Sequence, residues 1–207
     1  GICELKCKTI YFNEKAYSRK ELNEYINDLS TYISKNIKSD SPFVLLTCYN
    51  HIKTFIAFFA ILRAKKIVVI LDPLSKNLEI TEIIEKIDPS LIIIPDIKND
   101  KFLYDTELIF RKSKFYTSEN LENVKLLAFT NAEDGYPKAA MLTEENLLFQ
   151  AEILINTNKI NFKSIICSLL PYSHMYGLMH GIIVPSQSET TSVILENNIL
   201  NLKYILY

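Results

Sequence analysis

The chain has 207 residues, of which 48% are hydrophobic and 11% aromatic, so it can bury a sizeable core as one domain or as two closely joined lobes. Its formal net charge of -1 excludes the strongly basic field of a protein that binds nucleic acid or an acidic membrane surface. No apolar run reaches the roughly 18 residues of a membrane span, and no signal peptide is visible at the start. We therefore expect a cytoplasmic protein with no nucleic-acid partner and no membrane span.

The first predicted elements are a hairpin and an amphipathic helix. Residues 9–17 have the pattern of a short hairpin, with Asn13 and Glu14 at its turn. Ser18 and Glu21 then form a capping box, which marks the start of a helix. The apolar residues of this helix share one face, which predicts packing against a core: Leu22, Tyr25, Ile26, Leu29, Ile33 and Ile37.

From residue 43 onward, strands and helices alternate. Residues 43–48 and 67–71 are apolar strands, and Asn50 could cap the helix between them. Lys65 and Lys66 follow that helix and are expected at a solvated helix end. The alternation implies right-handed crossovers, so the predicted fold class is α/β, with a mostly parallel sheet and flanking helices. The aromatic residues of the helix are predicted to be core: Phe55, Phe58 and Phe59.

The same alternation continues to a polar linker. A helix over residues 78–87 precedes a strand over 91–94 and a weaker strand over 107–110. The polar residues after it indicate a boundary between lobes. The predicted organisation is an N-terminal α/β lobe at 1–110, a linker at 111–123 and a second segment at 124–207.

Cysteine and histidine spacing predicts neither a disulfide framework nor a metal site. Cys3 and Cys7 lack a second ligand pair, while Cys48 and Cys167 lie in apolar runs, where a free thiol behaves as a small hydrophobe. We interpret all four as reduced thiols. The three histidines form no metal-binding spacing: His51, His174 and His180.

The central stretch of the chain has the order strand, loop, helix. Residues 124–129 predict a buried strand, and Thr143 is a plausible N-cap for a helix that runs to about residue 157. The loop between them contains Gly135, Pro137 and Lys138. Proteins commonly bind phosphate with such a loop, because backbone N–H groups and the helix dipole both favour an anion.

Glycine usage supports a special role for a few positions. Only 4 of the 207 residues are glycine, whereas a typical share is about 7%, so glycine is expected where backbone geometry demands it. Apart from Gly1, these positions are Gly135, Gly177 and Gly181.

A further strand over residues 164–170 leads into Pro171-Tyr172-Ser173-His174. The carboxyl end of a parallel strand is where ligands bind in open sheets, so His174 is a candidate site residue, with a structural histidine as the alternative. Residues 175–181 could begin a helix that lines a pocket there. A strand at 191–195 is expected to form an exposed sheet edge.

Three collinear stretches carry a family resemblance. Residues 129–143, F-T-N-A-E-D-G-Y-P-K-A-A-M-L-T, resemble the phosphate-loop signature Y/F-T-S-G-S/T-T-G-x-P-K-G-V of the adenylate-forming superfamily, which includes acyl-CoA synthetases, peptide adenylation domains and luciferases. Residues 43–73 look like its strand, helix and strand ending in a D-P turn. Residues 170–177, L-P-Y-S-H-M-Y-G, look like its P-x-x-H-x-x-G motif.

The resemblance implies a fold and an activity. The fold would be the first part of the large N-terminal domain of an acyl-CoA synthetase. The reaction would activate a carboxylic acid with ATP and magnesium, release pyrophosphate, and pass the acyl group to a thiol of CoA or of a carrier protein. His174 would lie beside the acyl substrate, and Lys138 would assist the phosphates. The implied nucleotide-binding positions are Thr130, Asn131, Gly135 and Lys138.

The loop also departs from the family pattern. Asn131, Ala132 and Ala139 replace a serine and two glycines, and Glu133 and Asp134 place carboxylates where the family binds phosphates. Two like charges about 4 Å apart repel by about 1 kcal/mol in bulk water and about 4 kcal/mol near a protein surface. Unless these acids hold magnesium, ATP binding would be weakened. A catalytically inactive homologue that acts as a binding module is therefore the alternative interpretation.

Other family elements do not occur in the 207 residues. The resemblance implies an aromatic-Gly-x-S/T-E adenine motif, an acidic residue for the ribose hydroxyls and a small C-terminal domain with a catalytic lysine. We therefore expect a truncated site that is completed by a missing C-terminal domain or by a protein partner.

Overall fold

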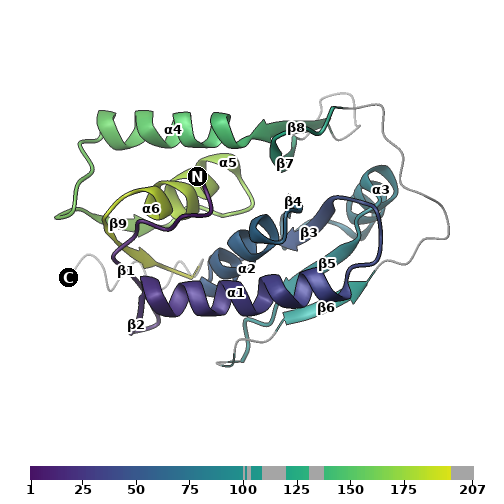
Figure 1. Cartoon of the computed structure of the whole chain (residues 1–207), viewed down its shortest axis with the longest axis horizontal. Coiled ribbons are helices and arrows are strands. Elements are labelled where there is room, and N and C mark those ends of the chain that lie inside the picture. The colour runs from purple at the N-terminus through teal and green to yellow at the C-terminus, as the bar shows by residue number, and fades with distance from the viewer. Residues whose placement is uncertain (100, 102–103, 109–119, 131–137, 197–207) are drawn as a thin grey trace.

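The computed structural model describes residues 1–99, 101, 104–108, 120–130 and 138–196. Its strands form two sheets (Figure 1). The smaller has the order β2 (Lys15–Ser18), β1 (Thr9–Phe12), β10 (Thr191–Ile194), β9 (Ile165–Ser168). The larger has the order β6 (Tyr104–Leu108), β5 (Leu91–Pro95), β3 (Phe43–Thr47), β4 (Ile67–Leu71), β7 (Val124–Thr130), β8 (Lys138–Thr143).

The inner strands of both sheets pair mainly in parallel. In the six-stranded sheet β3 pairs in parallel with β4 and β5, and β4 pairs in parallel with β7. In the four-stranded sheet β10 pairs in parallel with both β1 and β9. Each sheet thus combines strands from before and after residues 111–123, and the lobe division predicted there stays a prediction. The predicted α/β class with a mostly parallel sheet and flanking helices is confirmed.

The N-terminal hairpin and helix form as their local signals predict. Asn13 and Glu14 have positive φ values of 47° and 62°, which suit the tight turn between β1 and β2. Ser18 and Glu21 make the capping box that begins helix α1 (Arg19–Asn36). Its apolar stripe is buried at Leu22, Ile26, Leu29 and Ile33.

Helix α2 (Ile52–Arg63) is the centre of the core. Every residue from Ile52 to Leu62 is buried, because the helix lies between α1 and the strands β3, β4 and β5. The predicted cap was wrong: His51, not Asn50, is the N-cap, and its Nδ1 accepts a hydrogen bond from the Lys53 backbone N–H. The prediction of a core aromatic cluster is confirmed, since the three phenylalanines are all fully buried: Phe55, Phe58 and Phe59.

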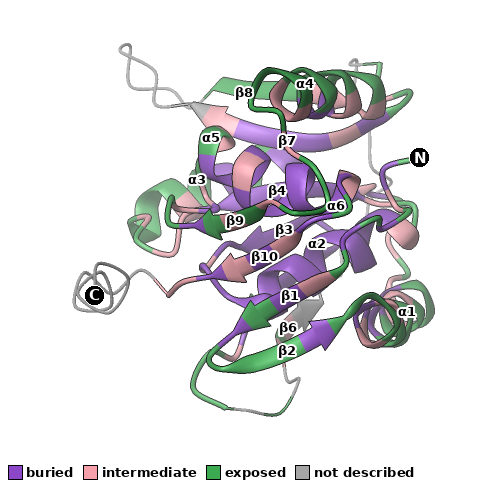
Figure 2. Ribbon diagram, turned by 90° about the vertical axis from the view of Figure 1, so that its left-hand side faces the viewer, coloured by how far each residue is buried: buried purple, intermediate pink, exposed green. Residues whose placement is uncertain are grey.

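The six-stranded sheet is covered on both faces. Val44 and Leu46 of β3 pack into the cluster around α1 and α2, whereas Phe43 and Leu45 pack into a second cluster with Ile83 of α3 (Asn77–Ile87). Because both faces of β3 are covered, residues on each face are apolar, and the strand is a continuous apolar run in the sequence. Figure 2 shows the resulting buried centre, with exposed residues concentrated on α1, α4 (Glu144–Thr157) and the sheet edges.

Three strand predictions need correction. The strand predicted at 107–110 is β6, which lies at Tyr104–Leu108 and pairs antiparallel to β5. The strand predicted at 191–195 as an edge is β10, which lies inside its sheet because β1 and β9 flank it. The loop after β7 leads not to a helix but to β8, which pairs antiparallel to β7. Local pattern cannot specify any of these pairings, because each depends on a distant partner.

The helix-end lysines also differ from each other. Lys65 is exposed at φ 57°, the left-handed conformation that commonly ends a helix. Lys66 is half-buried, and its Nζ donates to the Ser41 carbonyl at 3.0 Å, so it is not simply a solvated cation. Among the described residues no helix is long and apolar enough to cross a membrane.

Candidate functional site

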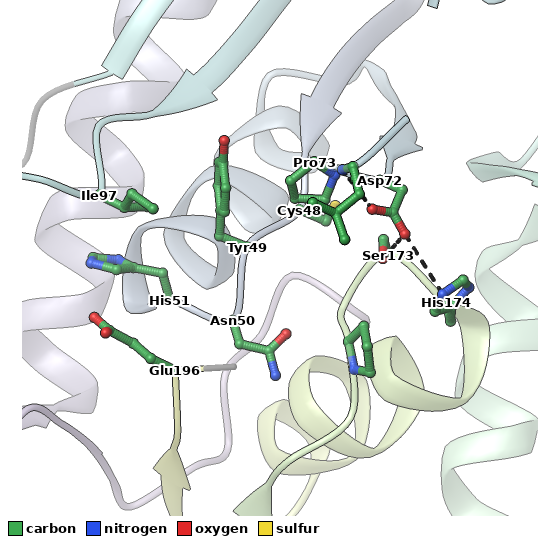
Figure 3. A pocket seen from close by; sticks show the side chains of 12 residues that line it. Cys48, Tyr49, Asn50, His51, Asp72, Pro73, Ile97, Ser173, His174 and Glu196 are labelled. Carbon is green, nitrogen blue, oxygen red and sulfur yellow. Dashed lines mark hydrogen bonds and ion pairs between the residues drawn. The ribbon is translucent and has the colours of Figure 1, made fainter. Parts of the chain in front are cut away.

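A cavity of about 450 Å³ lies at the carboxyl ends of strands from both sheets (Figure 3). It is lined by residues 48–51 after β3, residues 72–74 after β4 and Ile97 after β5. The second sheet contributes Pro171, Ser173 and His174 after β9, and Glu196 after β10. This edge is the usual ligand position in parallel sheets, so the cavity is the candidate site.

Asn50 joins the two sheets at this cavity. Its Nδ2 donates to the Leu170 carbonyl at 2.9 Å, and its Oδ1 accepts from the Tyr172 backbone N–H at 3.0 Å. The side chain is only 4% exposed. One buried amide therefore fixes the segment that carries His174 against the end of β3. Sequence reasoning missed this role, because an asparagine just before a helix is most simply interpreted as its cap.

Asp72, Ser173 and His174 form a polar cluster at one end of the cavity. Ser173 Oγ donates to Asp72 Oδ2 at 2.9 Å, and His174 Nε2 lies 3.6 Å from the same oxygen. The backbone N–H of Leu74 donates to Asp72 Oδ1 at 2.8 Å. The His174 side chain is 68% exposed, so its ring is accessible from solvent. The sequence indicated His174 but gave Asp72 no role beyond the D-P turn.

His51, at the other end, is a structural residue. Burial, and secondarily the charge of Lys53, lower its pKa to about 4, so the ring is neutral at pH 7. Its ring centroid lies 4.2 Å from that of Phe12, which packs it into the core. Lys53 itself is buried, and its ammonium donates to the carbonyls of Asp96 and Asn99.

The Cys48 thiol in the cavity wall is not a nucleophile at neutral pH. Burial raises its pKa to about 12, and Sγ donates to the Leu46 carbonyl at 3.4 Å. The interpretation of Cys48 as a small core hydrophobe agrees with its 2% exposure.

Two glycines allow the helical residues after His174 to pack closely against the segment that carries it. A Cβ at Gly177 would lie 2.0 Å from the Pro171 carbonyl oxygen, and one at Gly181 would lie 2.1 Å from Cε1 of the buried Tyr172 ring. The helical run α5 (Met175–Leu178), η1 (Met179–Ile183), α6 (Val184–Gln187) can therefore approach the segment closely. Five-residue π-helical geometry at η1 is itself unusual. Close packing against Pro171 therefore explains why the residue three positions after His174 is a glycine.

The described part of the predicted phosphate loop consists of its two flanking residues, Thr130 and Lys138. Thr130 ends β7 and pairs with Lys138, which begins β8, so the loop between them closes an antiparallel hairpin. The six residues of β8 lie between that loop and α4 in the chain, so the predicted order of strand, loop and helix does not hold. The two other predicted positions, Asn131 and Gly135, lie outside the described residues, as do Glu133 and Asp134. Their proposed roles stay predictions.

The described residues test only part of the predicted site. His174 lines the cavity, whereas the described residue Lys138 does not. Ile70 of β4 pairs with Ala128 of β7 in parallel, so the carboxyl end of β7 lies at the same edge of the sheet as the cavity. In the part of the chain that the structure describes, no group of three or more His, Cys, Asp or Glu side chains is placed to hold a metal ion.

A family model described as AMP-binding enzyme matches residues 6–205. The chain belongs to the AMP-binding enzyme family. The resemblance seen in the sequence motifs is therefore confirmed, over nearly the whole chain. A comparison with curated protein sequences found no match.

Solved structures share the fold of this member of the AMP-binding enzyme family at low identity. Apo MatB from Rhodopseudomonas palustris superposes with a TM-score of 0.77 at 14% identity, covering 99% of this chain and 44% of that one. ATP-bound MatB gives 0.76 at 14% identity, covering 98% and 45%. A fatty acyl-adenylate ligase from L. pneumophila, in complex with acyl adenylate and pyrophosphate, gives 0.71 at 20% identity, covering 98% and 38%. The chain thus spans less than half the length of these proteins.

Proposed function

We propose that the chain carries the acid-binding part of an ATP-dependent ligase. In the proposed reaction, a carboxylate oxygen of the acid attacks the α-phosphorus of ATP, and the bond to pyrophosphate breaks to give an acyl adenylate. A thiol of CoA or of a carrier protein then takes the acyl group and releases AMP. The observation that carries the proposal is the cavity, to which the P-x-x-H-x-x-G segment contributes His174.

The cavity suits a small acid with an apolar body. Its volume of about 450 Å³ lies toward the lower end of the range of ligand pockets. Tyr49, Pro73 and Ile97 provide apolar wall. His174 is the side chain that we assign to the acid's carboxylate, because its ring lines the cavity and is accessible. Ser173 and Asp72 orient it.

The nucleotide would approach from the β7–β8 hairpin. We propose that Thr130 and the exposed cation Lys138 flank its phosphates, because both lie at the base of that hairpin, on the edge of the sheet that bears the cavity. ATP with magnesium would supply the activating phosphoryl group. The MatB bound to ATP has the same fold, which supports the use of ATP. The 207 residues contain no adenine motif, so we expect no acid-dependent exchange of pyrophosphate into ATP from this chain alone.

Two matched leucine variants test the acid site. Leu74 is 90% exposed at the cavity rim, whereas Leu78 is 71% exposed on α3 and does not line the cavity. Leu74→Glu places a carboxylate at the rim and should weaken binding of short-chain carboxylic acids about tenfold, since like charges repel at a partly exposed site. Leu78→Glu should leave it unchanged.

The measurement is calorimetric titration with a series of straight-chain acids. Failure of the wild type to bind any acid, or equal weakening by both variants, would show that the cavity is not the acid site. Because both side chains are exposed, neither variant should alter the urea midpoint by much.

A second candidate function is a protein-binding module. Among the described strands, β9 lies at one edge of its sheet, and three side chains on or just after it are exposed: Ile165 at 69%, Leu169 at 45% and Leu170 at 44%. Such an edge can accept a strand from another protein. Sedimentation of the wild type and of Ile165→Lys tests this: association that the charge abolishes supports the module, and a monomer at all concentrations contradicts it.

A further inference from the structure

We propose that the cavity selects an acid with an ammonium group at the end remote from its carboxylate, and that Glu196 binds this ammonium. The inference rests on the proposed function, because it assumes that the carboxylate lies at the His174 end. The ligand class is a short ω-amino acid, with an apolar chain between its two charged ends.

The charges of the cavity favour an ammonium. Its charged lining side chains are the carboxylates of Asp72 and Glu196, and among the described residues no lysine or arginine lines it. His51 contributes no positive charge at pH 7, since burial holds it neutral. An acid with a second carboxylate would therefore meet repulsion at the far end, whereas an ammonium would be attracted.

The two carboxylates differ in their capacity to take a ligand. Asp72 already accepts from Leu74 N and Ser173 Oγ and faces His174 Nε2. Glu196 Oε1 accepts only the Asn13 side-chain amide at 3.2 Å, and no donor in the described ranges contacts its Oε2. A carboxylate can accept about four hydrogen bonds, so Glu196 can take an ammonium donor.

The positions of the two carboxylates on opposite sides of the cavity predict an elongated ligand. Figure 3 shows Glu196, His51 and Ile97 together on one side, Asp72, Ser173 and His174 on the other, and Tyr49 between them. An elongated ligand would contact the tyrosine ring along its apolar middle. This leaves the ammonium at Glu196 and the carboxylate at the His174 ring, while the Asp72 oxygens already accept from Leu74 N and Ser173 Oγ.

One cation lies close to the proposed ammonium site. Lys53 is 1% exposed, and its ammonium is turned into the protein, where the carbonyls of Asp96 and Asn99 accept its protons. It therefore does not line the cavity. Lys53 thus donates to backbone carbonyls inside the protein, and Glu196 is the charged group on this side of the cavity that faces the ligand.

Three acids of equal chain length test the proposal: ε-aminocaproate, caproate and adipate, which end in ammonium, methyl and carboxylate. We expect the wild type to bind aminocaproate about tenfold more tightly than caproate, and adipate most weakly. Glu196→Gln should reduce the affinity for aminocaproate to that for caproate. Glu196→Lys should reverse the preference, toward adipate. The control Glu189→Gln removes an exposed carboxylate that does not line the cavity and should keep the wild-type order.

The outcomes separate the two proposals. If caproate and aminocaproate bind equally, or if the preference persists in Glu196→Gln and Glu196→Lys, the ammonium site is wrong while the acid site stands. If none of the three acids binds, the acid site itself is wrong. Calorimetry without ATP gives these affinities directly, and thermal unfolding of each variant confirms that it is folded.

Discussion

The two sheets of the molecule differ in how deeply their strands are buried. In the six-stranded sheet all five residues of β3 and all five of β4 are buried, because helices cover both faces. In the four-stranded sheet β9 buries only Ser168, and Ile165 is 69% exposed. The central strands of the first sheet are completely buried, whereas the second sheet positions His174 and has β9 at an exposed edge among the described strands. Substitutions should therefore affect stability mainly in the first sheet, whereas binding depends on the strand ends of both sheets.

The largest effect is expected in the core beneath the six-stranded sheet. Phe55→Ala removes a fully buried ring from α2 and should lower the free energy of unfolding by about 3–5 kcal/mol, since the cavity left behind cannot collapse completely. Phe149 on α4 is 64% exposed, so Phe149→Ala is a matched control expected to change stability by less than about 0.5 kcal/mol. Urea unfolding measures both. Similar losses would contradict the contrast between buried and exposed faces.

The second effect is a pH dependence at the junction of the sheets. The folded pKa of His51, about 4, lies below its usual value of 6.5, so the unfolded state binds a proton first as pH falls. The stability from neutral His51 is fully present above pH 6.5 and is lost as pH falls toward 4. We expect a loss of about 2 kcal/mol between about pH 7 and pH 5.

His51→Asn keeps a good N-cap and should flatten that pH dependence. Burial also lowers the pKa of His180, so a smaller loss of the same sign should remain in the variant. Urea unfolding at the two pH values gives both slopes. An unchanged slope in His51→Asn would show that this ring is not the responsible group.

The third effect concerns the amide that links the two sheets. Asn50→Ala leaves the Tyr172 N–H without its partner and should cost about 1–2 kcal/mol of stability. It should also weaken acid binding, because the His174 segment is no longer fixed. Asn36→Ala removes an exposed side-chain bond to the Tyr32 carbonyl and should change neither quantity measurably. Loss of stability with unchanged acid affinity would limit Asn50 to a structural role.

The smallest effect on stability is expected at the open edge. Ile165→Thr should change the free energy of unfolding by less than about 0.5 kcal/mol, because the side chain is largely exposed. Its neighbour Ile166 packs partly against the core, so Ile166→Thr should cost about 1 kcal/mol or more. Equal costs, measured by urea unfolding, would show that β9 is covered in solution.

The sequence by itself determined the local elements and the family. Apolar runs and caps are local signals, so β3, β4 and the starts of α1 and α4 follow from nearby residues, such as Ser18 and Thr143. The motif residues also lie close together in the chain. The sequence alone therefore predicts roles for His174 and Gly177, although it does not reveal the reason for Gly177, which is its close approach to Pro171.

Tertiary structure decided which elements meet. Nothing local specifies that β1 pairs with β10, that residues 138–143 add a strand to β7, or that Asn50 bonds to the segment after β9. Each choice depends on partners far away in the chain, and strand pairing is selected by the burial of whole faces rather than by the period of one segment. The cavity and its two carboxylates arise from these long-range pairings, which bring Asp72 after β4 and Glu196 after β10, from different sheets, to one cavity.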